Sequence, residues 1–400
     1  MIFSTVVAPL QQRLNVNVPR SILSKLKFMK RKNYAIGSSQ PFSTSSSDQS
    51  NSSSSSSNSN TNHAFDRTLK NLQRQNVSQN LPSTYHENYD YIREELASRL
   101  VDRLDDIIRD EGFPLALDIG AGPGFLYKKI VQDDAIGGGQ GAIGGVRKLV
   151  MLDSCEGMLH RDDELMDNMS QEEKDRCGTY SLVADEEERL PFPDGTFDLV
   201  LSSAAMHWVN DLPNLWREIR RVLKPDGCFM FAMVGGATLT ELRSSLVLAE
   251  MERDGGVSPH VGPFVDFADV GALLTNAGFN LTTIDIDTIK LGYPNAMVCM
   301  EHLQRMGENN ACVSRRPNMS ADTFLASACI YDELYPLEGQ GADEKDVEAT
   351  VQVIFGIGWT PHESQQQPDA RGSATKKIGE IVVDKSSSSP TGTNGDHNKE

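Results

Sequence analysis

The chain lacks the sequence features of several protein classes. It has no run of 18 apolar residues, so no membrane-spanning helix is predicted. Its six cysteines include no CxxC pair, which argues against a disulfide framework or a zinc ribbon and fits a reducing compartment. Basic residues are outnumbered, with 38 Lys and Arg against 56 Asp and Glu and a net charge of −18. Because phosphate binding needs a basic face, we expect no nucleic-acid partner.

Acidic residues are absent from the first 47 positions. This segment holds seven Lys and Arg residues and becomes rich in Ser towards its end, which is typical of an organelle transit peptide. A basic tail on a cytosolic protein is the alternative. Residues 38–60 then contain 14 Ser in 23 positions, too polar a stretch to fold. We therefore interpret residues 1–63 as a transit peptide and a disordered linker.

Short apolar runs alternate with helical patterns between residues 64 and 290. A helix is predicted at 85–109 and another at 212–223, where Asp211 can cap the start. Alternating strands and helices form βαβ units, and right-handed crossovers then give a parallel, doubly wound sheet. The runs predicted as its strands are 115–119, 148–152, 180–184, 197–201 and 228–233.

The C-terminal part has a different pattern. Two predicted helices, 294–306 and 320–334, separate a strand at 281–289 from a last strand at 351–359. We interpret residues 291–349 as a helical insert that forms a lid over the sheet edge where open α/β sheets bind ligands. Residues 350–384 would hold the last strand and a C-terminal segment, and the polar residues 385–400 a disordered tail. Residues 133–147 contain six Gly and are interpreted as a flexible insertion.

A glycine-rich turn follows the first predicted strand. Gly120, Gly122 and Gly124 allow a tight turn and a close approach of a ligand to the backbone. A dinucleotide fold would have GxGxxG, in which the third Gly comes one position later. A carboxylate at Asp118 is also unfavourable beside a pyrophosphate. A cationic sulfonium nucleoside fits this turn better.

Acidic residues stand at the ends of the next two strands. Asp153 can accept hydrogen bonds from ribose hydroxyls, as an acid at this place does in nucleotide-binding sheets. Asp185, followed by Glu186, can accept from an adenine amine, and Asp118 can bind an amino group directly or through water. The alternative is that these are ordinary turn residues, where Asp and Gly are common.

Four motifs resemble the class I methyltransferases that use S-adenosylmethionine. They are Leu117–Gly124, Asp153–Met158, Leu190–Asp198 and Arg221–Gly227. The resemblance implies a seven-stranded sheet and makes residues 64–290 a Rossmann-like domain, with an N-terminal helix, that binds S-adenosylmethionine. The cofactor positions carried over are Asp118, Gly120, Gly122, Gly124, Asp153, Asp185 and Glu186, and Ser154 and Ser202 are added as further cofactor candidates.

A second set of motifs is narrower. The segments 202–213, 255–264, 306–310 and 358–365 are similar to the mitochondrial complex I assembly factors described as arginine hydroxylases. This resemblance implies a protein of the mitochondrial matrix, soluble or peripheral on the inner membrane, that hydroxylates an arginine of a complex I core subunit. Methylation of a protein or a thioester, and a non-catalytic assembly chaperone, remain alternatives, since fold does not decide the reaction.

The catalytic residues are not identified by these motifs. His207 and Trp208 follow the fourth strand, where His207 can act as a base or orient the substrate, or the two can be a packed aromatic pair. His260 lies on a predicted loop of the lid, where function or turn stabilisation are both open. The spelling His160-Arg-Asp162 resembles part of an iron site, but neighbouring acids favour a solvated helix start. No metal site is predicted.

Overall fold

The computed structural model describes residues 63–79, 88–132, 142–337 and 346–366. The predicted disordered tail, almost all of the predicted transit peptide and linker, and residues 133–141 of the Gly-rich insertion lie outside these ranges. The chain divides into two units, Met1–Pro361 and His362–Glu400. Of the second unit only a short turn is described, in which Gln365 N donates to His362 O at 3.2 Å. The first unit carries the fold.

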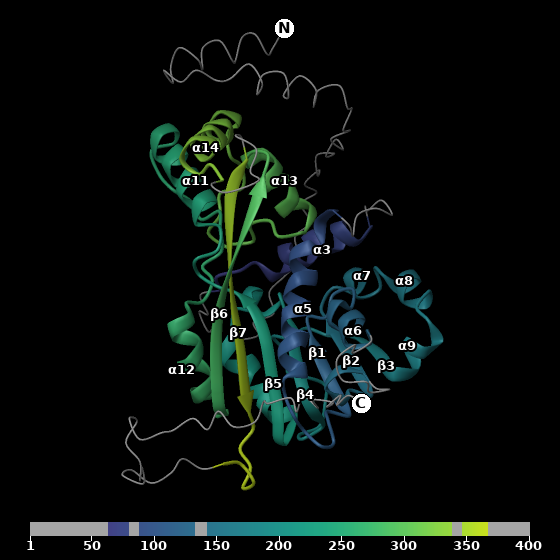
Figure 1. Cartoon of the computed structure of the whole chain (residues 1–400). Helices are drawn as coiled ribbons and strands as arrows, with labels where there is room; N and C mark the ends of the chain where they lie inside the picture. The colour runs from purple at the N-terminus through teal and green to yellow at the C-terminus, as the bar shows by residue number, and fades with distance from the viewer. Residues whose placement is uncertain (1–62, 80–87, 133–141, 338–345, 367–400) are drawn as a thin grey trace, which may run out of the picture. The chain divides into compact units, whose positions relative to one another are not determined.

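A seven-stranded sheet forms this unit, in the order β3-β2-β1-β4-β5-β7-β6 (Figure 1). Neighbours from β3 to β5 are parallel, and β7 runs antiparallel to both β5 and β6. The predicted doubly wound, mostly parallel sheet is confirmed. Its strands are β1 (Leu115–Ile119), β2 (Lys148–Asp153), β3 (Gly178–Val183), β4 (Phe197–Ser203), β5 (Leu223–Val234), β6 (Asn280–Tyr293) and β7 (Val347–Trp359).

Helices cover both faces of the sheet. One face packs against α5 (Tyr91–Asp105) and α6 (Phe125–Ile130), and the other against α10 (Leu212–Val222) and α12 (Phe267–Ala277). Successive side chains of a strand point to opposite faces, so Ala116 joins the first cluster and Leu117 the second. This double burial explains why β1 is a continuous apolar run rather than an alternating one.

The predicted boundaries of one helix and one strand differ from the structure. Helix α5 ends at Asp105, four residues before the predicted end, and residues 85–87 lie outside the described ranges. Strand β5 begins at Leu223 instead of 228, because the expected turn at 224–227 is a bulge within the strand. The pairing with β4 shifts there, from Phe197 opposite Leu223 to Leu199 opposite Cys228.

Short helices connect the strands at the edge of the sheet where β2 and β4 end. The acidic segment between β2 and β3 forms α7 (Glu156–Leu159), α8 (Asp163–Asp167) and α9 (Gln171–Arg176). A single 3₁₀ turn, η2 (Met206–Trp208), follows β4, and another, η1 (Ile143–Gly145), precedes β2.

Three helices gather at one end of β6 and β7 (Figure 1). They are α11 (Thr240–Arg253), α13 (Ala296–Arg305) and α14 (Ala321–Leu334), and we call them the helical cap. Leu242, Cys299 and Tyr331, one from each helix, share a buried cluster. The predicted insert supplies α13 and α14 only, while α11 precedes β6. Since β6 extends to Tyr293 and β7 begins at Val347, the predicted limits 291 and 349 fall inside strands.

Helix α3 (Arg67–Gln79) begins within the first residues that the structure describes. It was not predicted, because its sequence is polar and only Lys70 and Val77 are buried. It packs against α7 and lies between the helical cap and the sheet in Figure 1. Within the described part of the chain, no helix is long and apolar enough to cross a membrane.

Candidate functional site

The glycine-rich turn lies where β1 ends. Gly120 and Gly122 have φ of 72° and 53°, a region that favours glycine. A Cβ on Gly120 would lie 2.2 Å from the Ala205 Cβ, so a side chain there would clash. The amides of Gly120 and Ala121 donate to the Leu152 carbonyl at 2.8 and 3.0 Å, which fixes the turn against β2. The predicted tight turn is therefore present, and the approach of a ligand to its backbone stays a prediction.

Asp153 ends β2 and its side chain is completely buried. Its Oδ1 accepts from Cys155 N at 2.8 Å. Its Oδ2 accepts from Gly122 N at 2.8 Å and from Arg74 Nη2 at 2.7 Å. The carboxylate thus contacts the glycine turn and is also bound by a cation from α3, whereas its predicted bonds to ribose hydroxyls stay a prediction.

Two buried acids keep an oxygen unpaired. Asp118 Oδ2 and Glu186 Oε2 have no hydrogen-bond partner among the described residues. Burial raises the pKa of Asp118 well above its usual value, and nearby Asp153 adds to the effect. Burial also raises the pKa of Glu186, against the opposing charge of Arg67. Unpaired buried acceptors are uncommon and indicate a place for a ligand or a water molecule.

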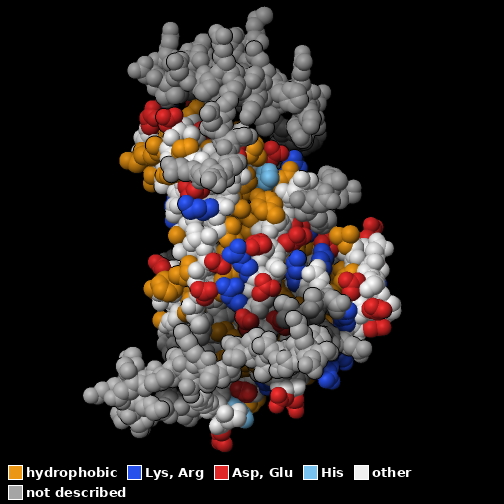
Figure 2. All heavy atoms as spheres, in the orientation of Figure 1, with side chains coloured by type: hydrophobic (Ala, Val, Ile, Leu, Met, Phe, Trp, Pro, Cys, Tyr) orange, Lys and Arg blue, Asp and Glu red, His pale blue; other side chains and the backbone are white. Residues whose placement is uncertain are grey.

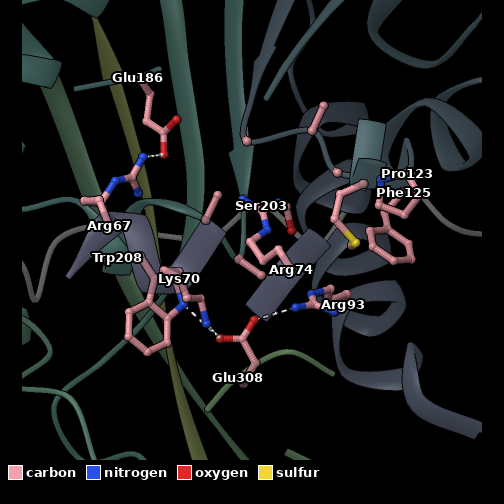
Figure 3. A pocket seen from close by; sticks show the side chains of 16 residues that line it. Arg67, Lys70, Arg74, Arg93, Pro123, Phe125, Glu186, Ser203, Trp208 and Glu308 are labelled. Carbon is pink, nitrogen blue, oxygen red and sulfur yellow. Dashed lines mark hydrogen bonds and ion pairs between the residues drawn. The ribbon is translucent and has the colours of Figure 1, made fainter. Parts of the chain in front are cut away.

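Basic residues of α3 pair with acids at the strand ends, and Figure 3 shows Arg67 beside Glu186. Arg67 Nη2 lies 3.0 Å from Asp185 Oδ1 and 2.6 Å from Glu186 Oε1. Lys70 and Arg74 follow on the same face of the helix, because residues three and four apart are neighbours there. The pocket that remains has a volume of about 20 Å³. That holds about one water molecule and no nucleoside.

A second, larger cavity adjoins this pocket. It measures about 860 Å³ and is lined mostly by apolar side chains from α5 and the helical cap, within the range of small-molecule sites. Arg93, Ala204, Trp208 and Glu308 line both spaces. Ala204 has a φ of 52°, which is unusual for alanine. The two spaces are therefore separated by a few side chains.

The predicted catalytic candidates border the large cavity. His207 is buried, which lowers its pKa, although Glu308 favours the charged form. Its ring centroid lies 5.4 Å from those of Trp208 and Phe264, so the packed aromatic pair and the cavity-facing position are both present. His260 Nε2 lies 2.9 Å from Glu250 Oε1 and 3.2 Å from Ser258 Oγ.

The two serine candidates lie at the ends of β4 and β2. Ser202 Oγ donates to the Ile119 carbonyl at 2.8 Å and is fully buried between β4 and β1. The next residue, Ser203, lines the pocket instead. The Ser154 carbonyl accepts from Asn71 Nδ2 of α3 at 3.2 Å.

Sequence reasoning missed the basic face of α3. Arg67, Lys70 and Arg74 recur at i, i+3 and i+7 in a segment too polar to suggest a core helix. That spacing was the available signal, since it predicts one basic helix face opposite the strand-end acids.

The His160-Arg-Asp162 segment contributes to ion pairs. His160 Nδ1 lies 3.0 Å from Asp163 Oδ2, and Asp162 pairs with Arg161 and Lys128. No group of three or more His, Cys, Asp or Glu residues in the described ranges is arranged to hold a metal ion.

Comparison with known proteins extends these observations. Residues 117–231 match a family model described as a methyltransferase domain. The chain is 42% identical to "Arginine-hydroxylase NDUFAF5, mitochondrial" of Danio rerio, over 80% of this chain and 92% of that protein. It is 43% identical to the protein of the same name in Homo sapiens, over 79% and 83%.

A solved structure is also similar in part. It is phosphoethanolamine N-methyltransferase 2 of Haemonchus contortus in complex with S-adenosyl-L-methionine. The two chains are 15% identical, with a TM-score of 0.41 over 72% of this chain and 60% of that one. The seven-stranded sheet and the methyltransferase-domain match together confirm the class I methyltransferase fold. With its identity to full-length relatives, the chain belongs to the NDUFAF5 family of mitochondrial arginine-hydroxylases.

Proposed function

We propose that the pocket at the glycine turn binds S-adenosylmethionine, and that the enzyme hydroxylates an arginine of a complex I core subunit. The observation that carries the cofactor assignment is the pair of unpaired buried acceptors, Asp118 Oδ2 and Glu186 Oε2, beside the glycine turn. These oxygens can accept hydrogen bonds from the amino and hydroxyl groups of a nucleoside that carries an amino-acid tail, whereas a pyrophosphate offers only acceptor oxygens.

The residues have distinct roles towards this cofactor. Asp153 would accept from the ribose hydroxyls, with Ser154 beside it. Glu186 and Asp185 would accept from the adenine amine, and Asp118 would face the amino group of the methionine part. When bound, S-adenosylmethionine supplies an activated methyl group on a sulfonium. Before the cofactor binds in this way, Arg67 must release Glu186 and Arg74 must release Asp153.

Replacing Asp153 with Asn tests the cofactor assignment. The change removes charge-assisted hydrogen bonds to the ribose and should weaken binding of S-adenosylmethionine by about 1.5–3 kcal/mol. Titration calorimetry measures the affinity, and circular dichroism checks folding. Asp163→Asn is the matched control, because Asp163 pairs with His160 on the surface. Equal affinities of the wild type and the Asp153 variant would show that Asp153 does not bind the cofactor.

The reaction rests on the family. The relatives are named arginine-hydroxylases, while the domain match favours methyl transfer as a second candidate. A third candidate, a chaperone without turnover, is favoured by the narrow space that α3 leaves. Mass spectrometry of complex I core subunits from cells with and without this protein separates the three. A gained oxygen indicates hydroxylation, a gained methylene indicates methylation, and an unchanged arginine indicates the chaperone.

The relatives are named as mitochondrial proteins, which supports a mitochondrial location. We propose the matrix, with the inner membrane as a peripheral docking surface. Sonication of isolated mitochondria distinguishes the two, because a matrix protein then enters the soluble fraction, whereas a peripheral protein stays with the membranes until carbonate or high salt releases it. Import of a chain that lacks residues 1–63 tests the transit peptide.

A further inference from the structure

Lys70 is a buried cation on an otherwise polar helix. Its side chain is 3% exposed. Its Nζ donates to the Gly307 carbonyl at 2.7 Å and to Glu308 Oε2 at 2.8 Å. It also lies 3.5 Å from the centroid of the Trp208 ring. Figure 3 shows the amine between the indole and the Glu308 carboxylate. This is an aromatic face, an anion and a carbonyl around one positive charge.

The groups around Lys70 are fixed by contacts of their own. Trp208 Nε1 donates to Glu308 Oε2 at 2.8 Å, which ties the indole to the carboxylate. Phe65 and Phe264 pack edge-on against the Trp208 ring, with centroids 5.0 and 5.8 Å away. We call Trp208, Gly307 and Glu308 the cation cage. The contacts of Trp208 with Glu308, Phe65 and Phe264 do not involve Lys70.

Glu308 holds two cations rather than one. Arg93 Nη2 donates to Glu308 Oε1 and, at 2.8 Å, to the Met306 carbonyl. Burial lowers the pKa of Lys70 to about 7, against the favourable charge of Glu308, and the charges of Arg93 and Arg74 add to the lowering. An arginine stays charged, but a lysine can lose its proton. Lys70 is therefore the more easily displaced of the two.

The cage lies between the two spaces of the site. Trp208 and Glu308 line both the narrow pocket at the glycine turn and the 860 Å³ cavity. Lys70 lines only the narrow pocket. Gln73, Asn76 and Val77 of α3 also line the cavity, so a side chain that enters it reaches Trp208 and Glu308 along this helix.

We propose that Trp208, Glu308 and the Gly307 carbonyl form a subsite for a guanidinium group, which Lys70 occupies until a substrate arginine displaces it. A guanidinium is planar, stacks on an indole and donates in a fork to a carboxylate. The identity of the incoming group rests on the proposed function, whereas the cage's selectivity for a cation does not. The competing explanation is that Lys70 only anchors α3.

The test is binding of N-acetyl-arginine methylamide, with the neutral citrulline analogue as its isostere, measured by calorimetry without S-adenosylmethionine. Lys70→Met removes the internal cation and should tighten binding of the arginine compound roughly tenfold, as expected for a cation–π and ion-pair competitor. Lys70→Arg fills the cage with a guanidinium and should weaken that binding. Lys224→Met, which removes a surface lysine paired with Asp198, is the control.

Two further results complete the test. Glu308→Gln in the Lys70→Met background should reverse the gain. Equal binding of the arginine and citrulline compounds overturns the subsite. An unchanged affinity of the Lys70→Arg variant for the arginine compound also overturns it. This variant keeps the positive charge, so we expect it to fold even if Lys70→Met does not. Because no cofactor is present, these outcomes are independent of whether the glycine turn binds S-adenosylmethionine.

Discussion

Replacing Arg74 with Gln should destabilise the free protein and tighten the binding of S-adenosylmethionine. Arg74 Nη2 lies 2.7 Å from Asp153 Oδ2, and the side chains are 16% and 0% exposed. Removing one partner of a buried ion pair costs about 3–5 kcal/mol. We expect about 3 kcal/mol, since Gly122 N and Cys155 N still donate to Asp153. The unfolding free energy from urea titration measures this loss.

The gain in affinity follows from the same contact. In the wild type, the ribose hydroxyls must displace Arg74 from Asp153. In Arg74→Gln, the Asp153 carboxylate no longer accepts a hydrogen bond from Arg74, so the ribose hydroxyls have no arginine to displace. A hydrogen bond to a charged group contributes about 1.5–3 kcal/mol, and the lower value corresponds to roughly tenfold tighter binding. Titration calorimetry with S-adenosylmethionine and S-adenosylhomocysteine measures the change.

A matched control separates this effect from general loss of stability. Arg161 Nη2 lies 2.6 Å from Asp90 Oδ2, and both side chains are buried. Arg161→Gln should lower the unfolding free energy by a similar amount and leave cofactor affinity unchanged. Weaker cofactor binding by Arg74→Gln would refute the reasoning, because it would mean that Arg74 holds the bound cofactor rather than competing with it.

Three further predictions concern stability, the glycine turn and the N-terminus. Since burial lowers the pKa of Lys70 to about 7, the unfolded chain binds one more proton between pH 7 and about 10. Stability should therefore rise with pH there by up to about 1.4 kcal/mol per unit, and the slope should fall in Lys70→Met, as urea titrations at several pH values would measure. Gly120→Ala should destabilise by about 2 kcal/mol or more, because of the positive φ and the 2.2 Å approach to Ala205; an unchanged melting temperature would contradict the turn geometry. N-terminal sequencing of the protein from isolated mitochondria should find a start between residues 33 and 64, and an intact Met1 would count against import with cleavage.

The acidic composition does not form a single patch on the face shown in Figure 2. Basic and acidic side chains are intermixed there. Arg99 and Arg103 of α5 pair with Asp287 and Asp285 of β6 at 2.6 and 2.8 Å. Glu308 lies in the interior between Lys70 and Arg93. We therefore place recognition of a client arginine at the cation cage and not on this surface.

The sequence determined the features that depend on neighbours along the chain. The buried strands appear as apolar runs because each is covered on both faces. Helix α10 was recognised from Asp211, whose Oδ1 accepts from Asn214 N at 3.0 Å, and from Pro213 in the first turn. The glycine turn and the acid at Asp153 follow their strands directly, so local pattern was enough to place them at one sheet edge.

Only the tertiary structure decided how the site is closed. Helix α3 buries almost no apolar side chain, so its stability depends on ion pairs with acids that lie far away in the sequence. Arg74 pairs with Asp153, and Lys70 with Glu308. The joining of α11 with α13 and α14 likewise depends on packing across the sheet edge. The spacing of Arg67, Lys70 and Arg74 indicates a basic helix face but not its partners, because a cation is satisfied by any carboxylate that the fold brings near it.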